Sequence, residues 1–228
     1  MKHILKNEFL HSFKSFKSII IILFFTLTSY LTASYLSNNT SLLGDQVNTG
    51  SAYTSSIKLL VFFLGFLFVF SVSHDLINRE LDYQTIRLLV TKTSKLNIIF
   101  GKFLGVLLFW IISISISFII ISFYAHDWFL KDYIITIIVL FYIVSLVTFL
   151  STIIPKPSVT MFIGILVGIL APILGFWGAF SEKWFLIPFK FILPYYYVVK
   201  SNFFMIVPLL IGITFLLLSY FIFNRKDL

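Results

Sequence analysis

Long apolar segments alternate with short polar ones along almost the whole chain. About 20 apolar residues in a helix cross the ~30 Å hydrocarbon core of a bilayer, and most of the apolar segments have about this length. Backbone amides in lipid must be hydrogen-bonded within the segment, so such segments are helices. The pattern predicts an all-α polytopic membrane protein with six transmembrane helices, at residues 18–37, 58–73, 103–124, 133–154, 159–180 and 204–223.

Composition supports a membrane protein and excludes several other classes. The 228 residues are 59% hydrophobic and only 11% charged, which is more apolar surface than a soluble core of this size can bury. No polar segment is long enough to fold separately, so we expect a single transmembrane domain over residues 1–228. The chain has no cysteine, which excludes disulfides and thiolate metal sites.

The basic residues indicate the orientation. If the N-terminus is inside, twelve of the 17 Lys and Arg residues are inside and five are outside, namely Lys58, Lys131, Lys183, Lys190 and Lys200. Inner loops of membrane proteins carry the excess of Lys and Arg. We therefore expect both termini in the cytoplasm and, from a composition typical of AT-rich bacterial genomes, a bacterial cell membrane. Topology accounts for most of the net charge of +8, so no nucleic-acid partner is expected.

Residues 1–17 are predicted to form an amphipathic interfacial helix in contact with membrane lipids. Leu5, Phe9, Phe13 and Phe16 recur at helical spacing and define one apolar face. Near the other end of the chain, residues 181–203 are aromatic but interrupted by prolines. This outer segment is predicted to form short re-entrant helices.

Residues 74–102 form the only long inner loop, and the pattern predicts a half-buried helix within residues 75–90. Ile77, Leu81 and Leu88 recur at helical spacing, and charged residues lie between them. Residues 155–158, Pro-Lys-Pro-Ser, are predicted to form a tight inner turn. These two segments are the candidate surfaces for a cytoplasmic partner.

Several kinds of chemistry have no support in the sequence. The predicted spans hold almost no ionisable residues, with Lys58, His74 and Asp75 only at the edges of the second one. Ion-coupled transporters usually place such residues in mid-membrane. The chain has no phosphate-binding GxxxxGK[ST] loop, and we find no catalytic dyad and no metal-ligand spacing among its four histidines. We therefore predict no catalytic site, no metal site and no ATP site in this chain.

Hydroxyl side chains do occur within the predicted spans. Two interpretations remain open for them: interhelical hydrogen bonds, or the lining of a substrate path. The residues concerned are Thr28, Ser29, Thr32, Ser113 and Ser117.

Two local motifs resemble those of a known family. Residues 80–89, ELDYQTIRLL, with Gly101-Lys102 after them, are similar to the E…GT-x-R-x-LL…GK stretch of ABC-2 type (type V) exporter permeases. Gln84 stands where that family has glycine, and residues 93–95 lack its usual proline. The closing residues 223–228, FNRKDL, also resemble the family's C-terminus. The layout of six helices is similar as well.

The resemblance implies a permease subunit that couples to a separate ABC ATPase subunit, which would bind ATP and Mg. It also implies a second permease copy, in a homodimer or a related heterodimer. The inner loop would hold the coupling helix. The residues expected to couple to the ATPase are Arg79, Glu80, Asp82, Arg87, Pro155 and Lys156.

The small size of the chain resembles Gram-positive permeases that export amphipathic or antimicrobial peptides. Lipid-linked glycans and small drugs are alternative substrates. The competing function is a membrane-embedded immunity or regulatory protein that binds its ligand without transport. An ATPase gene beside this one would favour the exporter.

Overall fold

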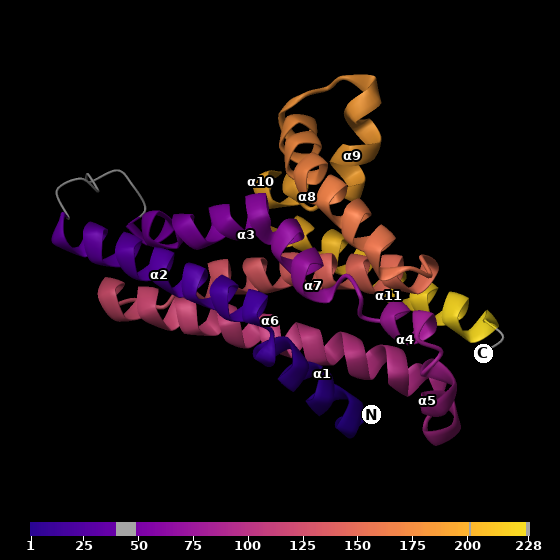
Figure 1. Ribbon diagram of the computed structural model, residues 1–228. Coiled ribbons are helices and arrows are strands. Elements are labelled where there is room, and N and C mark those ends of the chain that lie inside the picture. Colours follow the sequence, from indigo (N-terminus) through magenta and orange to yellow (C-terminus); the bar gives the residue numbers. More distant parts are fainter. Residues whose placement is uncertain (40–48, 201, 227–228) are drawn as a thin grey trace.

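The computed structural model describes residues 1–39, 49–200 and 202–226, and within these ranges the regular structure is helical throughout (Figure 1). Six of the helices are long and apolar enough to cross a membrane, which confirms the predicted fold class. They are α2 (Phe16–Asn38), α3 (Thr49–Ser73), α6 (Lys95–Ala125), α7 (Leu130–Ile153), α8 (Pro157–Phe180) and α11 (Ile206–Arg225).

Two of these helices begin about two turns earlier than predicted. Helix α3 starts at Thr49, nine residues before the predicted span, because hydropathy detects only the apolar part of a helix. Its first turns are polar, and the Ser55 hydroxyl is satisfied within the helix by the Ala52 carbonyl. Helix α6 starts at Lys95 and so contains Lys102, which we had assigned to the loop at 74–102. The segment between α2 and α3 is correspondingly shorter than residues 38–57, which separate the first two predicted spans, and residues 40–48 lie outside the described ranges.

Helices α6 and α7 form the centre of the bundle. Over half of their membrane-length segments is buried, 56% and 61%, against 22% for α2 and 28% for α11. Helix α2 packs on α6, α11 packs on α7, and α3 packs on both α7 and α8. Gly164 and Gly168 of α8 lie against Phe70 and Leu67 of α3, where any side chain would overlap them. The GxxxG pair therefore serves close helix packing.

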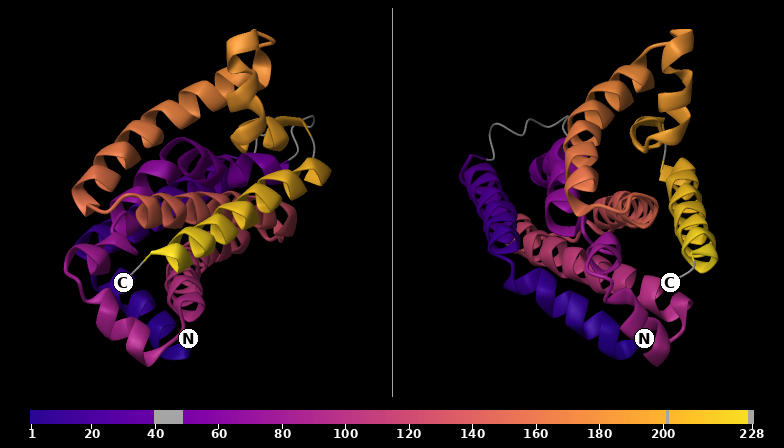
Figure 2. Two further views of the ribbon diagram at one scale, coloured as in Figure 1. Left: turned by 90° about the vertical axis from the view of Figure 1, so that its right-hand side faces the viewer. Right: turned by 45° about the vertical axis from the view of Figure 1, so that its right-hand side comes forward.

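The N-terminus, the end of α11 at Arg225 and three further helices lie at one end of the bundle, called here the termini end (Figures 1 and 2). Helix α1 (Lys2–Lys14) stops before the predicted limit at residue 17, because Ser15 is extended and α2 already begins at Phe16. The prediction of a single inner helix within residues 75–90 is wrong. Two helices, α4 (Asn78–Asp82) and α5 (Ile86–Lys92), are separated by a turn in which Gln84 has a φ of 56°.

The segment between α8 and α11 forms four short helices, as expected for a chain interrupted by Pro188 and Pro194. They are η2 (Trp184–Leu186), α9 (Ile187–Ile192), α10 (Tyr195–Lys200) and η3 (Asn202–Met205). Helix α9 and the end of α8 stand out from the other helices (Figure 2). The Tyr195 hydroxyl donates to the Phe62 carbonyl of α3 at 2.8 Å, which fastens α10 to the bundle. How deep these helices lie in a membrane stays a prediction.

Candidate coupling site at the termini end

The start of α4 is held by a buried polar network. Asn78 is fully buried, and its side-chain amide donates to the Thr160 hydroxyl of α8 at 2.7 Å. The Ser151 hydroxyl of α7 donates to the Asn78 side-chain oxygen and accepts the backbone N–H groups of Ile77 and Asn78. Buried polar groups that are satisfied in this way hold one geometry, because breaking a bond leaves an unpaired group. Helix α4 is therefore fixed to both α7 and α8.

A buried charge cluster fixes the same segment to α1 and α6. Lys102 of α6 is only 1% exposed, and its Nζ lies 2.5 Å from Glu8 Oε1 of α1 and 2.8 Å from Glu80 Oε1 of α4. One ammonium group thus bridges two carboxylates. Arg79 brings the balancing charge, with Nη2 at 3.8 Å from Glu8 Oε1. A buried ion needs such partners because the desolvation of an unpaired charge is very unfavourable.

Arg79 also contacts two groups at the edge of this cluster. Its Nη1 lies 3.2 Å from Asp75 Oδ2 and 3.1 Å from His11 Nε2. A guanidinium group has no acceptor, so His11 Nε2 is the acceptor in this contact. The cluster, defined here as Glu8, His11, Asp75, Arg79, Glu80 and Lys102, thus joins three helices and the turn before α4.

The close approach of α1 to α6 makes the contact between Glu8 and Lys102. A Cβ placed on Gly105 would lie 2.8 Å from Glu8 Cβ and 2.9 Å from the Leu5 carbonyl oxygen. A side chain at Gly105 would therefore push α1 away. The predicted apolar face of α1 is divided: Phe13 packs on Phe109 of α6 with ring centroids 5.0 Å apart, whereas Phe16, in α2, is exposed.

The turn between α4 and α5 exposes a different kind of surface, called here the tip. Tyr83 is 72% exposed and Leu88 68%, and Arg87 beside Leu88 is exposed as well. Ile86 points inward and is buried, so α5 is fastened by one side and open on the other. An aromatic, an aliphatic and an Arg side chain exposed together are typical of a protein-binding surface. The left-handed backbone at Gln84, where the resembled family has glycine, makes the tip.

The residues predicted to couple to an ATPase divide into two groups. Arg79 and Glu80 lie in the buried charge cluster. Asp82 and Arg87 are exposed at the tip, and Pro155 and Lys156 are exposed in the turn between α7 and α8. That turn starts beside Ser151 and ends before Thr160, so it belongs to the same end of the molecule as α4.

Sequence reasoning missed Glu8, Lys102, Asn78, Ser151 and Thr160. A signal existed for two of them. Lys102 is a lone charge at the start of a strongly apolar segment, and Glu8 is the only acid among the first 44 residues. Because a buried charge needs a partner, the two could have been paired in advance. The three neutral residues carry no comparable signal.

The hydroxyl residues predicted for a substrate path lie within the bundle. Ser29, Ser113 and Ser117 are fully buried, and Thr28 and Thr32 are half-buried. The hydrogen bonds of all but Ser29 go to carbonyls in the preceding turn of their own helix, so these bonds do not join two helices as the first of the two interpretations required. A role in a substrate path stays a prediction.

The longer helices take in ionisable residues that the predicted spans lacked or held only at an edge. Besides Lys102, α3 contains Lys58 well inside the helix, with its Nζ 2.8 Å from Asp132 Oδ2 in the first turn of α7. Thr54 donates to the same carboxylate oxygen. The pair is about one-fifth exposed and joins α3 to α7 at the end away from the termini. Within the described ranges, no group of three His, Asp or Glu residues could hold a metal ion.

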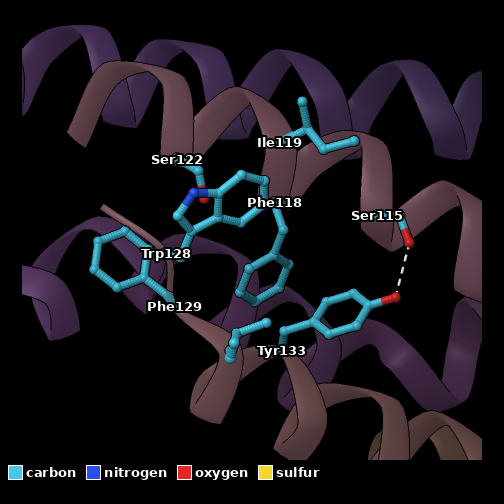
Figure 3. Close-up of a pocket in the computed structure, with 8 residues that line it drawn as sticks. Ser115, Phe118, Ile119, Ser122, Trp128, Phe129 and Tyr133 are labelled. Carbon is cyan, nitrogen blue, oxygen red and sulfur yellow. Dashed lines mark hydrogen bonds between the residues drawn. The ribbon is translucent and has the colours of Figure 1, made fainter. Parts of the chain in front are cut away.

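A small pocket opens between α6 and α7 at the same end (Figure 3). It has a volume of about 250 Å³, and aromatic side chains including Phe118, Trp128 and Phe129 form much of its wall. The Ser115 and Tyr133 hydroxyls hydrogen-bond each other at 2.8 Å on one side of it. The pocket thus combines an apolar wall with a polar edge.

These features define a polytopic membrane protein whose exposed tip at the termini end is anchored to the membrane helices through α4. A family model for ABC-2 family transporter proteins matches residues 3–186. The chain belongs to this family, and it is a membrane-spanning permease subunit of an ABC transporter. The matched range includes the whole charge cluster, the Asn78 network and the tip. A comparison with curated proteins gave no match.

Proposed function

We propose that this permease works as an exporter in the bacterial cell membrane, with its termini end in the cytoplasm. Two copies, identical or related, join two ATPase subunits that bind ATP and Mg. The tip is the docking surface for an ATPase subunit. Asp82 and Arg87 make the polar contacts there, and Pro155 and Lys156 extend the surface.

One observation carries this proposal: the tip is open, whereas the segment that leads to it is fixed to four helices. Tyr83, Arg87 and Leu88 are exposed. Yet Asn78 at the start of α4, only a few residues earlier, is buried and hydrogen-bonded, and Glu80 pairs with the buried Lys102. A closely packed element moves as a unit and transmits displacement to its neighbours. A movement of the ATPase at the tip would therefore reach α1, α6, α7 and α8 together.

Arg79 and Glu80 have a different role in this scheme from the one expected from sequence. Both side chains face Glu8 and Lys102, so they hold α4 from the inside. Arg87 and Leu88 are the residues that remain available for the partner. Removal of Arg87 would weaken docking, whereas removal of Glu80 would loosen the connection between the tip and the membrane helices.

Amphipathic peptides are the proposed substrates. The pocket between α6 and α7 supports this choice, because it offers an apolar wall beside serine and tyrosine hydroxyls. Such a site can hold an apolar side chain while polar groups of the same peptide bond at its edge. Its place at the end away from the termini suits a substrate that leaves on the outer side.

The test is co-purification of the permease with its ATPase, followed by export of a labelled amphipathic peptide in cells. Arg87→Glu and Leu88→Asp should each weaken binding, since loss of a partly shielded contact at an interface costs roughly 2–5 kcal/mol. Asp127→Lys is the control, because Asp127 is an exposed charge at the other end. All three variants should reach the membrane in equal amounts.

Equal ATPase binding and equal export in the two tip variants and the control would contradict the docking proposal. Activity of the chain in cells that lack any partner ATPase would instead support the competing immunity or regulatory function. Loss of export with the ATPase still bound would place the tip in transmission and not in docking.

A further inference from the structure

Three lysines of the short helices after α8 are each held against aromatic rings. Lys183 Nζ lies 5.3 Å from the Trp177 ring centroid. Lys190 and Lys200 converge on one ring, that of Tyr196, with their Nζ atoms at 4.7 and 5.3 Å from its centroid. An ammonium ion over a ring face is attracted by the ring quadrupole, so these contacts orient the charges.

None of the three lysines forms an ion pair within the described ranges. The ion pairs there involve Lys58, Arg79 and Lys102 only, and Glu182, the nearest acid in sequence, is exposed and unpaired. Two ammonium ions beside one phenol ring repel each other, and an anion bound between them would offset this repulsion. A hydrogen bond from Lys200 and the charges of Lys200 and Lys190 lower the pKa of Tyr196. The local charge around Tyr196 is therefore positive.

The same segment has one face fixed to the bundle and one face open. Leu186, Leu193, Tyr195 and Tyr197 are buried, and the Tyr142 hydroxyl of α7 donates to the Ile192 carbonyl at 3.0 Å. On the open side, large apolar side chains are exposed, namely Trp184, Phe185, Ile187, Phe189, Phe191 and Ile192. Aromatic residues mixed with lysine are typical of the layer where lipid head groups meet hydrocarbon.

We propose that Lys190 and Lys200 bind the phosphodiester group of an anionic phospholipid in the outer leaflet. The exposed aromatic side chains contact its acyl chains. The ammonium groups supply charge-assisted hydrogen bonds to the phosphate oxygens. In an anionic phospholipid no cation of the head group neutralises the phosphate, so the lysines attract it more strongly than the phosphate of a zwitterionic lipid. This site lies apart from the tip and the charge cluster, so it is independent of the proposed docking of an ATPase.

The experiment measures lipid retention by the purified permease without any ATPase. The protein is reconstituted in nanodiscs of phosphatidylcholine with an increasing fraction of phosphatidylglycerol, extracted gently, and the bound lipids are identified by native mass spectrometry. The test variant is Lys190→Gln/Lys200→Gln. The control is Lys131→Gln, which removes an exposed lysine of α7 that lacks an aromatic partner among the described residues. A Lys190→Arg/Lys200→Arg variant keeps the charge.

The wild-type protein, the control and the arginine variant should retain phosphatidylglycerol in preference to phosphatidylcholine. The glutamine variant should lose this preference, by about fivefold for each lysine removed. Equal retention of the two lipids by the wild-type protein, or an unchanged preference in the glutamine variant, would overturn the proposal. Binding of an acidic amphipathic peptide that depends on Lys190 and Lys200, without any preference for phosphatidylglycerol, would assign these lysines to a peptide. That result would also overturn the proposal.

Discussion

The Lys102 ammonium group is almost completely buried, and it pairs with two carboxylates at once. Both Glu8 and Glu80 approach its ammonium group through one oxygen, and Glu80 Oε2 accepts no hydrogen bond within the described chain. Buried ion pairs rarely increase stability over apolar residues of equal size, but they define which groups must meet. Here they define how α1, α4 and α6 meet.

Lys102→Met should destabilise the protein strongly, because it leaves Glu8 and Glu80 buried without their shared cation. Removal of one partner of a buried pair typically costs ~3–5 kcal/mol. The measurement is the midpoint of thermal unfolding in detergent. The triple variant Glu8→Gln/Glu80→Gln/Lys102→Met, which removes all three charges, should recover most of the loss. An unchanged midpoint for Lys102→Met alone would show that the three charges are not buried together.

The sequence identified these residues unequally. Glu80 and Arg87 stand in a motif that resembles the family, so both could be singled out, but the motif does not say which faces inward. The inward direction of Glu80 depends on Lys102, which is 22 positions after Glu80 in the chain, and on Glu8, which is 72 positions before it. Periodicity within one segment cannot supply such a contact, because it reports only which residues share a helix face.

At the scale of elements, α1 and α6 form a contact that hydropathy does not reveal. Sequence patterning placed α1 at the membrane surface through its apolar residues, whereas its most buried residues are the polar Glu8 and Ser12. The contact depends on Gly101 and Gly105, which give the backbones room. Long apolar helices were predictable because the bilayer demands them. The break between α4 and α5 was not, because it rests on one residue, Gln84, in a left-handed conformation.

Gly105→Ala should displace α1 and lower the stability by ~1–3 kcal/mol, the usual effect of overpacking a tight contact. The added methyl would meet Glu8 Cβ and the Leu5 carbonyl, and a backbone atom cannot turn away. Gly65→Ala in α3 is the matched control, since its Cβ would meet only side-chain atoms, the flexible end of Ile143 at 3.3 Å and Val61 Cγ1 at an ordinary 3.5 Å. The unfolding midpoints of the two variants should differ clearly. Equal midpoints would mean that α1 does not depend on this close approach.

At the scale of the whole molecule, six crossings bring α1 and the last turn of α11 to one end, where the charge cluster, the tip and the turn at Pro155 and Lys156 gather (Figure 1). The end of α11 joins them: Lys95 Nζ donates to the carbonyls of Asn224 and Lys226. Of the closing FNRKDL motif, Asp227 and Leu228 lie outside the described ranges. The basic bias that predicts a cytoplasmic termini end thus coincides with the candidate coupling site.

The absence of cysteine in the sequence allows a clean test of orientation. Single cysteines at Lys131 and Lys183 should react with a membrane-impermeant thiol reagent in intact cells. Cysteines at Arg87 and Lys156 should react only after the membrane is opened. All four positions are exposed, so accessibility within the fold does not limit the reaction. The opposite pattern would place the termini end outside and rule out docking of a cytoplasmic ATPase there.

The most direct test of the docking tip is photo-crosslinking from a single position. A photoreactive phenylalanine analogue in place of Leu88 lies on the exposed side of α5, and the same analogue in place of Trp184 is exposed at the other end. In cells that export the substrate, the protein with the analogue at Leu88 should form a covalent adduct with the ATPase subunit, and the protein with the analogue at Trp184 should not. An active transporter with no ATPase adduct at Leu88 would contradict the account.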